Sequence, residues 1–175
     1  MRAKLRYVFS IAMFLFVFST NAQNSLFKKV SRIKNAEKIS KYQLNKEQVS
    51  YFELDESLLK KHIAKAPLRT SKTNEPLIVS IPTENGEAEA FKIFEAPVFS
   101  PELSAKYPEI KSYVGFGVNN PQARLRMSVS PLGIKTMVSY PDKPTVFMEP
   151  TSINHEAYIL YSKNSKDPNN DIFEC

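Results

Sequence analysis

The chain has 175 residues, of which 42 % are apolar, so it can bury the core of one ordinary domain but is short for two. Its formal net charge is +6, but three basic residues precede position 23, and without them 21 basic residues face 18 acidic ones. The remaining charge of +3 removes the main support for a nucleic-acid partner.

The first 22 residues have the pattern of a secretory signal peptide. A basic start is followed by an apolar run at residues 7–18, about a dozen residues long. A membrane-spanning helix needs roughly 20, so we expect no stable membrane anchor. Small residues predict cleavage between Ala22 and Gln23. The chain is therefore expected to meet the secretion machinery and to be secreted, either to the periplasm or outside the cell.

The N-terminal third of the chain mixes helix and strand signals. Residues 24–42 place apolar residues at helical spacing, with lysines that we interpret as a solvated face. Residues 49–54 predict a strand, and Asp55 is expected to cap a helix that Pro67 ends. His62 lies in this helix and has no metal-ligating residue three or four positions away.

A β-hairpin is predicted next. Residues 76–83 and 88–96 are rich in β-branched and aromatic residues and flank Asn85-Gly86. Both residues of this dipeptide accept a positive φ, which makes it the strongest short hairpin signal.

Residues 94–117, FEAPVFSPELSAKYPEIKSYVGFG, contain the densest local signals. Ser100 is a predicted N-cap followed by Pro101, and Pro108 limits the helix to a few residues. We expect this segment to be scaffold, with its apolar side chains mostly in the core. These side chains are Phe94, Val98, Leu103, Tyr107, Ile110 and Tyr113.

The rest of the domain predicts a β-meander. Strand signals recur up to residue 163 and are separated by proline-containing turns. Arg124 and Arg126 alternate with apolar residues, so one face of that strand is solvated. The predicted fold is α+β: a single domain with an antiparallel β-meander sheet of about six or seven strands and two or three short helices.

Four parts follow from these signals. They are a signal peptide (1–22), a helical and polar lead-in (23–46), an α+β domain (47–162) and a polar tether (163–175). The tether ends in Cys175, the single cysteine, so an exported chain cannot form an internal disulfide.

The sequence contains no catalytic motif of its own. Residues 155–159 begin like the zinc motif HExxH but lack its second histidine. A GxSxG motif is absent, and residues 115–117 lack the third glycine of a dinucleotide fingerprint. A cryptic active site would require His62 or His155 to lie buried beside a carboxylate or a serine.

Several runs carry a family resemblance over residues 47–175. FEAPV, SPEL, KYPEIKSYVG, PLG and YILYS resemble the N-terminal proregion of secreted bacterial reprolysin-like zinc metalloproteases. The resemblance implies a non-catalytic proregion that inhibits the protease and assists its folding, within the N-terminal fragment of a hydrolase precursor. The partner would be the cognate metalloprotease catalytic domain, in cis or in trans. Zinc would belong to that domain, and this chain would carry no cofactor.

The resemblance also gives Cys175 a candidate role. In related proregions a cysteine thiolate takes the open coordination position of the catalytic zinc and displaces the attacking water. Cys175, at the end of a polar tether, is a candidate inhibitory zinc ligand on the protease domain. It could instead pair with a downstream cysteine or have no role.

Two other classes of function remain open. One is a secreted or periplasmic binding or adhesion module without catalysis, which would need an exposed aromatic platform. The other is a secreted enzyme with the cryptic histidine site.

Overall fold

The computed structural model describes most of the predicted domain. The signal peptide with its expected cleavage site at Ala22 and Gln23, most of the lead-in and the end of the tether with Cys175 lie outside the described residues. The described residues are 26–31, 44–45, 48–71, 75–83 and 86–165.

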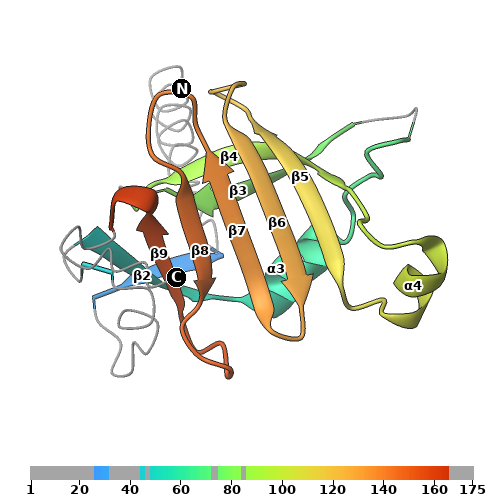
Figure 1. The fold of residues 1–175 in the computed structure, drawn as a ribbon, viewed down its shortest axis with the longest axis horizontal. Helices are drawn as coiled ribbons and strands as arrows, with labels where there is room; N and C mark the ends of the chain where they lie inside the picture. Colours follow the sequence, from blue (N-terminus) through green and yellow to red (C-terminus); the bar gives the residue numbers. More distant parts are fainter. Residues whose placement is uncertain (1–25, 32–43, 46–47, 72–74, 84–85, 166–175) are drawn as a thin grey trace, which may run out of the picture.

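A single antiparallel sheet, curled into a half-barrel, dominates the fold (Figure 1). Its order is β1-β2-β9-β8-β7-β6-β5-β4-β3, so from β3 to β9 each strand pairs with the next in the chain. The strands are β1 (Phe27–Val30), β2 (Val49–Leu54), β3 (Leu77–Pro82), β4 (Ala88–Glu95), β5 (Lys111–Gly117), β6 (Arg124–Ser130), β7 (Gly133–Ser139), β8 (Val146–Pro150) and β9 (Tyr158–Ser162). The helical elements are α3 (Glu56–Ile63), α4 (Pro101–Lys106) and the 3-10 turn η3 (Lys163–Ser165).

The prediction of six or seven strands with two or three helices is wrong. The described residues form nine strands, and α3 is their single helix of seven or more residues. The N-terminal strand β1 falls where apolar spacing predicted a helix. Phe27 and Val30 would share one face of a helix but take opposite faces of a strand. Both faces are apolar here, because Phe27 packs on the main core and Val30 on a smaller cluster with Tyr51 and Ile159.

Several local predictions are confirmed. The side chain of Asp55 accepts a hydrogen bond of 2.9 Å from the backbone N–H of Leu58 and caps α3. Ser100 caps α4 through the N–H of Leu103, at 3.3 Å. The predicted strand at 49–54 is β2, and the predicted hairpin is β3–β4. Helix α3, by contrast, ends at Ile63 and does not continue to Pro67 as predicted.

The main core lies on the inner face of the sheet, which we define as the face toward α3. This helix lies behind β5 to β7 in Figure 1 and inserts Leu59 and Ile63, which are 0 % and 1 % exposed. Each fully buried side chain of this size contributes roughly 1.5–3 kcal/mol of transfer free energy. Leu59 and Ile63 pack against alternate residues of the strands. These include Phe91, Ile93, Leu125, Met127, Ile134, Val138, Met148 and Leu160. The opposite side of the sheet is the outer face.

Residues 94–117 are mostly surface, so the prediction that their apolar side chains are mostly core is wrong. Tyr113 is buried, but Val98 is 73 % exposed, and Leu103 and Tyr107 are 38 % exposed. Phe94 and Ile110 are only partly buried. Helix α4 buries none of its side chains and projects beyond the sheet (Figure 1). Six residues make fewer than two helical turns, too few to lay an apolar stripe on the core.

Candidate functional site

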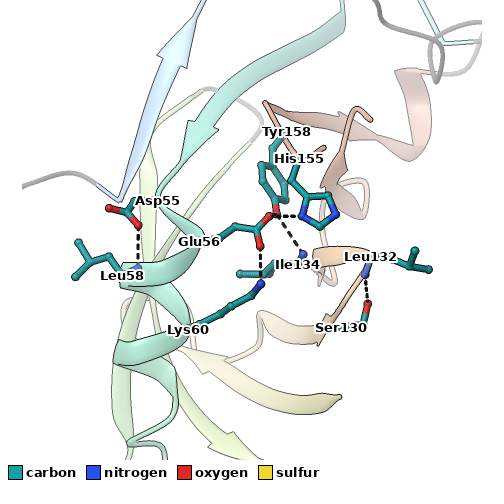
Figure 2. A network of polar contacts seen from close by, with 9 residues as sticks. All are labelled: Asp55, Glu56, Leu58, Lys60, Ser130, Leu132, Ile134, His155 and Tyr158. Carbon is teal, nitrogen blue, oxygen red and sulfur yellow. Dashed lines mark hydrogen bonds and ion pairs between the residues drawn. The ribbon is translucent and has the colours of Figure 1, made fainter. Parts of the chain in front are cut away.

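A cluster of polar side chains joins α3 to the connections at one end of the sheet (Figure 2). Oε1 of Glu56 lies 2.9 Å from Nδ1 of His155 and accepts a hydrogen bond from the hydroxyl of Tyr158. Oε2 of Glu56 pairs with Nζ of Lys60 at 2.6 Å. The backbone N–H of Ile134 donates to the Tyr158 hydroxyl at 3.2 Å. One carboxylate therefore links α3, the β8–β9 connection and the start of β7.

Local backbone features bring these groups together. Glu56 follows the N-cap of α3, where the helix dipole favours a negative charge. His155 adopts a φ of +53° in the β8–β9 connection. Gly133 has a φ of +96°, and a Cβ at this position would collide with Pro150 and come within 3.2 Å of the His155 ring and the Tyr158 hydroxyl. Glycine is therefore required for the β7 backbone to approach the cluster so closely.

Burial and charge shift two pKa values in the cluster. Burial alone would raise the pKa of Glu56, but hydrogen bonds from Lys60 and Tyr158 and the charges of Lys60 and His155 outweigh it. The pKa of Glu56 therefore lies below its ordinary value of 4.5. Burial, and then the hydrogen bond to Glu56, raises the pKa of Tyr158 well above 10. At neutral pH the cluster thus contains a carboxylate and a protonated phenol.

The two histidines of the cryptic-site hypothesis lie in different places. His155 lies beside a carboxylate, as that hypothesis required, but it is only partly buried, with 17 % of its side chain exposed. His62 instead contacts the carbonyl oxygen of Ile78 on β3 through Nε2, at 2.9 Å. No local pattern connects Glu56 with His155 or Tyr158, because Glu56 belongs to a helix far away in the chain.

His155 uses its Nδ1 atom to link two segments of the fold. Its Nε2 atom and the hydroxyl of Ser152 are buried, and each lacks a hydrogen-bond partner among the described residues. The two atoms are therefore not hydrogen-bonded to each other in this structure. Apart from the Glu56–Lys60 pair within α3, the bonds that the cluster makes join separate segments of the fold.

A mainly apolar depression of about 320 Å³ lies next to Lys60, between α3 and the ends of β5 and β6. Lys60 pairs with Glu56, and Lys111 pairs with Glu95 at 2.7 Å. Burial, and then the charge of Glu95, raises the pKa of Tyr113 to about 12, so its hydroxyl stays protonated. The depression is lined by Lys60, Ile63, Ala64, Pro108, Glu109, Lys111, Tyr113, Val129, Ser130 and Pro131.

The described part of the chain has neither a metal-binding cluster nor a membrane-spanning helix. It contains no group of three or more His, Cys, Asp or Glu side chains that could hold a metal ion. Cys175, the candidate zinc ligand, lies outside that part. None of the helices described is long and apolar enough to cross a membrane.

Comparisons with known proteins identify no relative. No family model, no curated protein and no solved structure matches the chain. The resemblance to metalloprotease proregions therefore remains a prediction from the sequence runs quoted above.

Proposed function

We propose that the chain is the non-catalytic proregion of a secreted zinc metalloprotease, which inhibits the protease and assists its folding. The observation that carries the proposal is the exposure of the segment with the densest family resemblance. Val98 is 73 % exposed, and Leu103 and Tyr107 are 38 % exposed, so the core does not require their apolar side chains. Apolar groups gathered on a surface commonly mark a site for another protein.

The topology of the sheet supports the folding role. From β3 to β9 each strand pairs with its neighbour in the chain, and only the β2–β9 pairing closes a long loop. Pairing between strands that are consecutive in the chain keeps the closed loops short, and short loops favour folding. N-terminal domains also generally fold first during synthesis. A domain of this kind can therefore present a finished surface to a catalytic domain that folds after it.

The polar cluster supports a scaffold role. Glu56, His155 and Tyr158 direct their bonds to one another, to Lys60 and to the backbone of Ile134. They hold α3 against the connections at one end of the sheet. These contacts would keep the outer face of the sheet and the α4 projection in fixed positions relative to each other while the protease binds.

Cys175 completes the proposal as the inhibitory zinc ligand on the protease domain. Its thiolate would displace the water that attacks the peptide bond. Cys175→Ala should weaken inhibition without lowering the midpoint temperature of unfolding. Equal inhibition by both forms would exclude the thiolate contact and leave the rest of the proposal intact.

The test begins with the coding DNA beyond the codon for Cys175. A frame that continues into a zinc-protease domain supplies the cognate enzyme, and otherwise the metalloproteases secreted by the same organism are used. The exported chain is then titrated into the enzyme while casein hydrolysis is followed. Dose-dependent inhibition, with no casein hydrolysis by the chain alone, supports the proposal. Lack of inhibition contradicts it and favours the secreted binding or adhesion module.

A further inference from the structure

On the outer face of the sheet, the charged side chains of β3 to β7 are all positive. Four exposed cationic side chains lie on it: Lys92 on β4, Arg124 and Arg126 on β6, and Lys135 on β7. The outward-facing positions of these five strands contain no Asp or Glu. We call Lys92, Arg124 and Arg126 the cationic face.

These three cations have no carboxylate partner among the described residues. By contrast, Lys135 on β7 pairs with Glu149 of β8 at 3.5 Å. The guanidinium of Arg124 donates to the backbone carbonyls of Pro121 and Ala123, which do not neutralise it. Arg124 and Arg126 are two residues apart on one strand face, about 7 Å along the strand, so their charges repel.

Apolar side chains alternate with the cations across the strands. Ile78 is opposite Lys92, Lys92 is opposite Phe116, and Phe116 is opposite Arg124. Ile78 is 51 % exposed and Phe116 is 39 % exposed. The Arg124 guanidinium lies 4.8 Å from the centre of the Phe116 ring. Arginine and exposed aromatic residues in this arrangement are enriched in protein–protein interfaces.

We infer that the cationic face docks an acidic surface of the protease catalytic domain. This inference rests on the proposed function and names the surface by which the proregion holds its partner. Unneutralised cations select an anionic partner by charge complementarity. The exposed side chains of Ile78 and Phe116 gain free energy only against apolar groups. A folded protein surface offers acidic and apolar side chains next to one another, which matches the alternation of cations with Ile78 and Phe116.

The experiment compares two triple variants with the same change in charge. Lys92→Glu/Arg124→Glu/Arg126→Glu reverses the cationic face, and Lys61→Glu/Lys65→Glu/Arg69→Glu reverses three exposed cations near α3. The inhibition constant of each is measured with the protease, from about 0.05 to about 0.5 M NaCl. The triple glutamine variant at positions 92, 124 and 126 replaces the first if its circular dichroism departs from that of the unmutated chain.

The inference predicts that the first variant inhibits at least about tenfold less well at low salt and that the control stays within about twofold. Salt should weaken inhibition by the unmutated chain. It should strengthen inhibition by the first variant, because salt screens the repulsion between the three glutamates and the acidic surface. If the unmutated chain inhibits and the first variant matches it, the docking face is refuted and the proregion function stands. If no chain inhibits, both fail. Binding of each chain to heparin, a polyanion, is measured in parallel. If the first variant loses heparin binding but inhibits as well as the unmutated chain, the face binds a polyanion instead.

Discussion

The Nδ1 atom of His155 lies 2.9 Å from Oε1 of Glu56 and fastens the β8–β9 connection to the first turn of α3. Among the described non-glycine residues, His155 alone has a positive φ, at +53°. Strained backbone of this kind persists where surrounding contacts over-determine it. Since α3 places Leu59 and Ile63 in the main core, the contact fixes a helix on which the core depends.

Removing the Tyr158 hydroxyl should destabilise the fold. Tyr158→Phe leaves Glu56 without one donor and the N–H of Ile134 without its acceptor. We expect the free energy of unfolding to fall by about 1–3 kcal/mol. Urea denaturation followed by circular dichroism measures the change. Tyr107→Phe, on an exposed ring, should change it by less than about 0.5 kcal/mol, and equal effects would contradict the role of Tyr158.

Acid should weaken the fold through Glu56. Its pKa is below 4.5 in the folded chain and returns toward that value on unfolding. The carboxylate therefore stabilises the fold fully above pH 4.5, and this stabilisation is lost as the pH falls through the lower folded pKa. We expect the midpoint temperature of Glu56→Gln to depend less on pH below 4.5 than that of the unmutated chain.

Thermal unfolding between about pH 7 and about pH 2.5 tests this linkage. Glu53→Gln is the matched control, because Glu53 pairs with Lys28 at 3.3 Å in an exposed position, where such pairs contribute little. Its curve should follow that of the unmutated chain. The same slope in acid for Glu56→Gln and the unmutated chain would show that Glu56 does not carry the effect.

Two glycines with positive φ should differ in their tolerance of alanine. Gly86→Ala should cost about 1–2 kcal/mol, because its φ is +79° but its new Cβ would meet the flexible end of Lys29. Gly133→Ala should cost more than about 2 kcal/mol, because its φ is +96° and the new Cβ would collide with the ring of Pro150. Denaturant midpoints of the two variants give the order, and the reverse order would contradict the close packing at Gly133.

Charged side chains should be tolerated on the α4 projection. Val98→Asp and Leu103→Asp should each change the free energy of unfolding by less than about 0.5 kcal/mol, because both side chains are exposed. Tyr113→Ala, in the buried part of the same segment, should cost about 3–5 kcal/mol. Under the proposed function the two aspartate variants should also weaken protease inhibition. Full inhibition by both would exclude this projection from the interface.

Local sequence determined the elements whose signals involve residues close together in the chain. Asp55 and Ser100 cap their helices as predicted, because an N-cap contacts an N–H only three residues away. The β3–β4 hairpin and the solvated face of β6 also follow from local patterns. The three-residue spacing of Phe27 and Val30 wrongly predicted a helix. A strand can have the same spacing when both faces of its sheet contact apolar groups, as they do here.

Tertiary structure decided the two features that bear on function. Glu56 meets His155 and Tyr158 only because the curled sheet brings the β8–β9 connection to the start of α3. Lys92 and Arg126 share a face through the strand register, which no local pattern encodes. The sequence alone determined which residues can be apolar, charged or helix-capping. Long-range pairing decided which of them are buried and which meet, because those contacts depend on backbone hydrogen bonds between distant segments.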